Sequence, residues 1–146
     1  MQIFTVFPLL TIPVIIYNIM ALSDRALGDV VSLRERLNEN IINIDMTSGV
    51  VWTITPGHLL ICLGLLTLFF ELLKSTGVGR SAIINHAFSM VLFIVCLVEF
   101  LMIDTFATSV FFLLTLMCLL DVMAGFIVTL SAARRDIGFV NGGGGE

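Results

Sequence analysis

Charge is what this sequence has least of. Only 12% of its 146 residues are Asp, Glu, Lys or Arg, whereas an ordinary soluble domain has about 25%. Hydrophobic residues make up 58% of the chain. A short soluble protein exposes much of its surface, so it could not hide this much apolar side chain from water. The formal net charge of −4 argues against nucleic acid as a partner, because its binders carry basic patches. Lipid is therefore the expected surrounding.

Paired cysteines and catalytic motifs are also missing. Cys62, Cys96 and Cys118 fall in apolar runs without a C-x-x-C pair, which indicates small buried hydrophobic residues. His58 and His86 each lie near the start of a predicted helix, but near opposite faces of the membrane, too far apart to ligate one haem iron. The chain has no metalloprotease, serine-hydrolase or phosphate-loop motif. We therefore predict a protein that is not an enzyme, with no cofactor and no metal, but with bound lipid.

The chain does contain four long apolar runs. A transmembrane helix needs about 20 mostly apolar residues, and the runs cover about 3–22, 54–73, 82–103 and 106–130. They predict an all-α integral membrane protein with a single four-helix transmembrane bundle over 1–135. A glycine-rich ending predicts a flexible tail over 136–146.

Helix-breaking and helix-capping residues refine these runs. Pro8 and Pro13 should bend or break the first helix, and neighbouring protein must then satisfy the freed carbonyl groups. Thr55 as a cap and Pro56 at the first helical position mark the start of the second helix. Asp104 or the following threonine can cap the fourth helix, which predicts an antiparallel hairpin of the last two helices.

A polar segment over 23–53 separates the first two runs. Its apolar residues recur at helical spacing, and Ser32 with Glu35 matches a capping box. This pattern predicts an amphipathic helix over about 30–45 that lies on the membrane surface or packs against protein. The apolar stripe of this helix consists of Val30, Leu33, Leu37, Ile41 and Ile44.

Ionisable residues inside the predicted spans are the candidate functional residues, since a charge in hydrocarbon normally faces a bundle interior, a cavity or a partner. Glu71 and His86 both fall about 10 Å toward the inner face, so we predict a polar pair. Asp121 falls near the midplane, and Glu99 lies about 10 Å toward the outer face. Either these two acids are protonated and hydrogen-bonded, or a cation on another chain meets them.

The fourth run also carries small or polar residues at every fourth position. Such a stripe lets two helices approach closely, and together with Glu99 it is the predicted packing surface or partner interface. Its members are Asp121, Gly125, Thr129 and Ala133. Three interpretations remain open: hydrogen bonds within the bundle, a lateral interface with a larger complex, and a proton or ion path.

Lysine and arginine in the short loops are slightly more frequent on the side of the two termini. We predict a multi-pass protein of a bacterial inner membrane, and this bias predicts cytoplasmic N- and C-termini. The expected function is a small non-catalytic accessory or assembly subunit that packs laterally on a larger membrane complex, for example a respiratory or photosynthetic one. The alternative is a small self-assembling channel or proton-coupled transporter that uses its intramembrane acids. Expected partners are the lipid bilayer, other integral membrane subunits and further copies of the chain.

Overall fold

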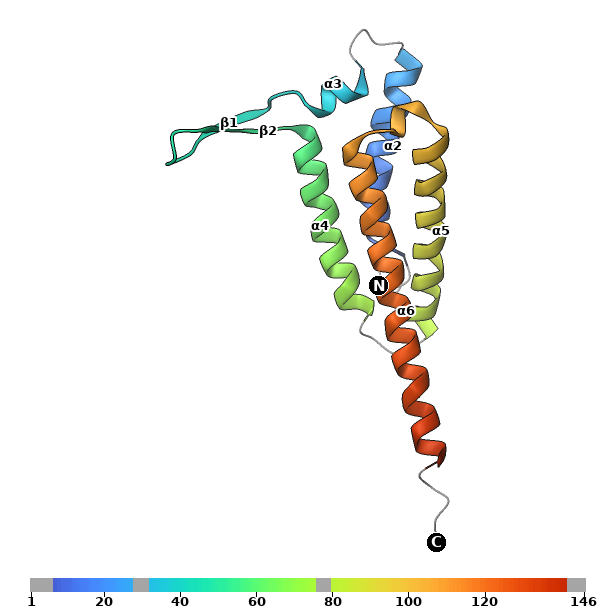
Figure 1. Ribbon diagram of the computed structural model, residues 1–146. Coiled ribbons are helices and arrows are strands. Elements are labelled where there is room, and N and C mark those ends of the chain that lie inside the picture. Colours follow the sequence, from blue (N-terminus) through green and yellow to red (C-terminus); the bar gives the residue numbers. More distant parts are fainter. Residues whose placement is uncertain (1–6, 28–31, 76–79, 142–146) are drawn as a thin grey trace.

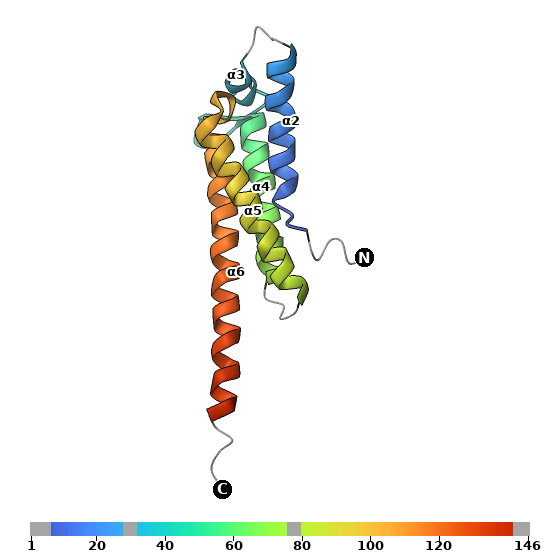
Figure 2. The same cartoon turned by 90° about the vertical axis from the view of Figure 1, so that its right-hand side faces the viewer.

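The computed structural model describes residues 7–27, 32–75 and 80–141. The four long helices α2, α4, α5 and α6 lie side by side in a bundle, and α6 continues well past the ends of α4 and α5 (Figures 1 and 2). In chain order the elements are α2 (Thr11–Leu27), α3 (Leu33–Leu37), β1 (Ile42–Asp45), β2 (Val51–Ile54), α4 (Pro56–Ser75), α5 (Arg80–Met102), the short 3₁₀ helix η1 (Asp104–Phe106) and α6 (Ser109–Asn141).

Three helices within this described part, α4, α5 and α6, are long and apolar enough to cross a membrane. The prediction of a helical membrane protein is confirmed at this level, whereas the count of four spans is not. The helix α2 begins at Thr11, after Pro8, and Pro13 lies in its first turn, where proline is tolerated. Residues 3–6 of the predicted first run lie outside the described residues. The 17 residues of α2 span about 26 Å, which is less than the hydrocarbon core of about 30 Å.

The core of the bundle is mainly apolar and is closely packed around α6. A Cβ atom at Gly64 would lie 2.8 Å from side-chain atoms of Leu114 and Met117, so α4 approaches α6 this closely because residue 64 is glycine. Completely buried apolar side chains include Leu10, Tyr17, Phe111 and Leu114.

The start of α4 agrees with the sequence prediction. Pro56 is the first helical residue, and the hydroxyl oxygen of Thr55 accepts a hydrogen bond from the His58 backbone N–H at 3.3 Å. The Thr55 backbone N–H in turn donates to Nδ1 of His58 at 3.3 Å. This reciprocal cap gives His58 a structural role in the first turn of α4.

The turn between α5 and α6 is longer than predicted. The two helices are antiparallel neighbours, as expected (Figure 1), but α6 begins at Ser109 instead of residue 106. Asp104 heads the short helix η1, and Thr108 caps α6 by accepting the Phe111 N–H at 3.2 Å. The side chain of Phe106 is buried in the core and holds this 3₁₀ turn against the bundle.

The predicted amphipathic helix over 30–45 is wrong for most of its length. Glu35 does close a capping box, since its carboxylate accepts the Ser32 N–H at 3.0 Å, but α3 ends at Leu37. The side chain of Asn38 turns back to the Arg34 carbonyl at 2.8 Å and competes with further helix. The next residues form the antiparallel hairpin β1–β2, which extends sideways from the bundle (Figure 1).

The stripe that defined this predicted helix is divided between different environments. Leu33 and Leu37 are buried against the bundle, whereas Ile41 and Ile44 are exposed in and beside β1. Val30 lies outside the described residues. The stripe therefore forms no single continuous face.

Candidate functional site

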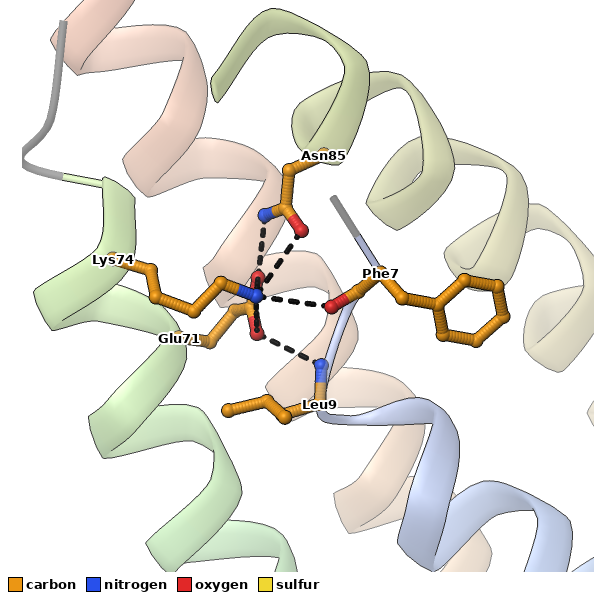
Figure 3. A network of polar contacts seen from close by, with 5 residues as sticks. All are labelled: Phe7, Leu9, Glu71, Lys74 and Asn85. Atoms are coloured by element: carbon orange, nitrogen blue, oxygen red, sulfur yellow. Dashed lines mark hydrogen bonds and ion pairs between the residues drawn. The ribbon is translucent and has the colours of Figure 1, made fainter. Parts of the chain in front are cut away.

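Glu71 on α4 is the most deeply buried carboxylate among the described residues, with a side-chain exposure of 0%. A lone charge in this position would be very costly. Figure 3 shows that polar groups from three segments converge on it. Its oxygen Oε2 accepts the backbone N–H of Leu9 at 2.8 Å, and Oε1 accepts a hydrogen bond from the Asn85 amide on α5.

Lys74 supplies the positive charge one turn further along α4. Its Nζ lies 3.3 Å from both carboxylate oxygens of Glu71 and forms an ion pair with it. It also donates to the Phe7 carbonyl at 2.9 Å and to Oδ1 of Asn85 at 3.3 Å. Asn85 therefore donates to the carboxylate and accepts from the ammonium group, which fixes the orientation of its amide.

We call these five residues, Phe7, Leu9, Glu71, Lys74 and Asn85, the polar clamp. The clamp joins α4, α5 and the segment that precedes α2. It satisfies the backbone groups beside Pro8, which have no helical partners there. This agrees with the prediction that neighbouring protein satisfies the backbone groups freed by the prolines of the first helix.

The predicted pair of Glu71 and His86 does not form. The hydrogen bonds of Glu71 go to the other clamp members, because Asn85 rather than His86 occupies the face of α5 that meets α4. The His86 ring lies instead on Gly125 of α6, where a Cβ atom would meet its Cγ and Cε1 at 3.0 Å. Its Nδ1 atom is buried and has no hydrogen-bond partner.

Asp121 is buried within the bundle, between α6 and α5, with an exposure of 4%. The hydroxyl group of Ser89, itself 2% exposed, lies beside it. Oδ2 of Asp121 and Oγ of Ser89 are both without a partner. Together with Nδ1 of His86, they give three unsatisfied polar atoms between the same two helices.

Glu99 also has a neighbour within the chain. It is partly buried, and its Oε2 accepts a hydrogen bond from the side-chain amide of Asn18 on α2 at 3.3 Å. The same amide donates to the Val14 carbonyl at 3.1 Å. This contact joins α5 to α2 through a neutral donor.

The described half of the predicted stripe on α6 packs against another helix of the same chain. Asp121 and Gly125 are buried against α5. The side chains of Thr129 and Ala133 lie outside the described part of the structure.

Sequence reasoning missed Asn85 and the backbone groups of Phe7 and Leu9. The spacing of Glu71 and Lys74 by three residues was the available signal for an ion pair. The buried face of α5 contains Asn85, Ser89 and Cys96, spaced by four and seven. His86 lies beside this face.

Chemically, the clamp can hold three segments together. No group of three or more His, Cys, Asp or Glu residues with metal-binding geometry occurs among the described residues. The clamp groups are all engaged with each other, whereas the His86–Ser89–Asp121 group retains unused donors and acceptors. No family model, curated protein or solved structure matches this chain.

Proposed function

We propose that this chain is a small accessory or assembly subunit that packs laterally on a larger integral membrane complex. The observation that carries the proposal is the length of α6, which has 33 residues and projects beyond the ends of α4 and α5 (Figures 1 and 2). Only Ser109–Val128 is the membrane-span candidate of this helix. Because an isolated helix is marginal in water, the projecting part suits contact with another subunit.

The polar clamp supports the same proposal. Its charges neutralise each other and its members come from three segments of the chain, which is typical of a structural contact. In this arrangement α2 and the segment before it complete a fourth membrane crossing. We propose further that both termini lie on the cytoplasmic side of a bacterial inner membrane, because lysine and arginine are slightly more frequent in the loops on that side.

Extraction from native membranes in a gentle detergent, followed by native gels and mass spectrometry, tests this proposal. We expect the chain to migrate with a large complex in constant stoichiometry. Ala133→Pro should break the projecting part of α6 through loss of a backbone hydrogen bond and release the chain from that complex. Gly143→Pro, two positions after Asn141, the last residue of α6, is the matched control and should leave migration unchanged. Migration of the native chain as a small homo-oligomer would contradict the proposal.

A proton path is the second candidate, and the unsatisfied atoms of His86, Ser89 and Asp121 favour it. Buried polar atoms without partners are uncommon in proteins, and an intramembrane acid can carry a proton. In vesicles that contain a pH-sensitive dye, Asp121→Asn should abolish proton flux while leaving assembly intact. Asp104→Asn, at the end of the bundle, is the control. Equal flux in the native and Asp121→Asn chains would exclude this path.

A further inference from the structure

The hairpin β1–β2 has one apolar face. Its register pairs Ile42 with Ile54 and Ile44 with Trp52, whereas Asn43 pairs with Thr53. Directly paired residues lie on the same face of a hairpin and successive pairs alternate between its faces. One face therefore carries four apolar side chains and no polar one: Ile42, Ile44, Trp52 and Ile54.

The opposite face is mainly polar. It carries Asn43, Thr53 and Asp45, with Val51 as its single apolar residue. Met46 and Val50 continue the alternation of the apolar face toward the turn, where the Met46 N–H donates to the Val50 carbonyl at 3.0 Å. The hairpin is thus an amphipathic element, although built on a period of two instead of the helical period.

The bundle leaves most of this apolar face uncovered, although Ile54, next to α4, is half-buried. Ile42 and Trp52 are each 52% exposed, and Ile44 is 38% exposed. Uncovered apolar side chains in such density mark a contact with lipid or protein. The identity of the contacting surface follows from where the hairpin lies.

The hairpin begins at the membrane boundary and runs away from the bundle. Ile54 precedes Pro56 by two residues, and Pro56 is the first residue of a membrane-span candidate. In Figure 1 the hairpin leaves the end of α4 across the direction of the helices, so it extends over the surroundings of the bundle. Lipid headgroups surround a membrane bundle at this depth, and tryptophan is enriched there.

We propose that the hairpin lies in the membrane interface, with the face of Ile42, Ile44, Trp52 and Ile54 against the lipid bilayer. It is a lateral anchor at one end of the bundle. The polar face, with Asp45, stays toward water. This role is independent of the accessory function, because it requires only lipid as the partner.

Trp52 is the only tryptophan of the chain, so its fluorescence reports on this face without any substitution. The full chain is reconstituted into phosphatidylcholine vesicles. We expect blue-shifted emission, strong quenching by phosphatidylcholine brominated near the carbonyl end of its acyl chains, and weak quenching by aqueous iodide. Emission that iodide quenches freely and brominated lipid does not quench would overturn the proposal.

A pair of adjacent substitutions supplies a matched control. Ile44→Lys places a charge on the proposed lipid face opposite Trp52, whereas Asn43→Lys places the same charge on the other face. We expect Ile44→Lys to shift the Trp52 emission to the red and to increase quenching by iodide, and Asn43→Lys to leave both near the native values. Equal responses of the two variants would contradict a lipid-facing side. Shielding of Trp52 in native membranes but not in vesicles would assign the face to a protein partner and overturn the proposal.

Discussion

At the scale of single residues, a buried charge is stable here because each of its oxygens has a partner. In the polar clamp, the carboxylate of Glu71 pairs with the ammonium group of Lys74. It also accepts hydrogen bonds from the Asn85 amide and the Leu9 backbone N–H. Breaking a buried ion pair is far more costly than removing both partners, because the remaining charge stays in an apolar environment.

Glu71→Gln should therefore destabilise the bundle by about 3 kcal/mol, the lower end of the range for buried pairs because Lys74 is 21% exposed. Adding Lys74→Met should recover part of this loss, since no unpaired ammonium group remains. Unfolding in mixed detergent micelles measures the free energy of each variant. Glu39→Gln, on an exposed residue, is the control. Equal effects at residues 71 and 39 would show that the clamp contributes nothing.

Gly125 gives a second prediction for a single residue. Gly125→Ala should cost about 1–3 kcal/mol through overpacking, because a Cβ atom there collides with the His86 ring. His86→Ala in the same chain should remove most of this cost, since contacting residues are not additive. The same unfolding measurement applies. If the double variant is as unstable as Gly125→Ala alone, the collision with His86 is not the cause.

The candidate residues could be selected from the sequence only in part. Charge and hydrophobicity were enough to single out Glu71 and Asp121, because an acid within an apolar run is unusual. The partner of Glu71 on α5 could not be selected in this way, because a small rotation of the helix decides whether Asn85 or its neighbour His86 faces α4. The backbone groups of Phe7 and Leu9 have no signature in side-chain patterns, so only the structure could show that they complete the clamp.

At the scale of elements, the hairpin shows how one segment can satisfy two patterns. Leu33, Leu37, Ile41 and Ile44 match helical spacing, but Ile42, Ile44 and Trp52 also match the alternation of strands. The β-branched residues and the turn over 47–49 decide in favour of strands. By contrast, the long runs of α4, α5 and α6 allow no such ambiguity, since their length and apolar character suit only a membrane helix.

The turn of this hairpin depends on Gly49, whose φ is +83°. A β-branched residue is strained there, so Gly49→Val should destabilise the turn by about 1–2 kcal/mol. Hydrogen exchange should then accelerate at the backbone amides of β1 and β2, while the amides of α4 to α6 keep their protection. Ser48→Ala is the control beside it. Unchanged exchange in the hairpin would show that the turn tolerates this conformation without glycine.

At the scale of the whole molecule, two contacts join the α2 region to opposite ends of the bundle: the clamp holds the segment just before α2, and the Asn18–Glu99 contact holds the middle of α2. Leu9 meets Glu71 near the end of α4, and Asn18 meets Glu99 near the end of α5. Because α4 and α5 are membrane-span candidates, this arrangement predicts that α2 crosses most of the bilayer despite its length.

Single cysteines can test this crossing after the three native cysteines are replaced. Phe7→Cys and Arg25→Cys should react with a membrane-impermeant maleimide from opposite sides of the vesicle. Ser48→Cys, at the tip of the hairpin, marks the side that Arg25→Cys should share. Labelling of positions 7 and 25 from the same side would show that α2 does not cross.

The polar clamp also has a consequence for the order in which the chain is assembled during synthesis. Phe7 and Leu9 leave the ribosome first, but their partners follow 62 or more residues later. The α5–α6 pair, in contrast, is joined by a short turn and can form as soon as both helices are made. We therefore expect the first helix to stay near the insertion machinery without its clamp contacts until residue 85 has entered the membrane. The clamp then forms and completes the bundle.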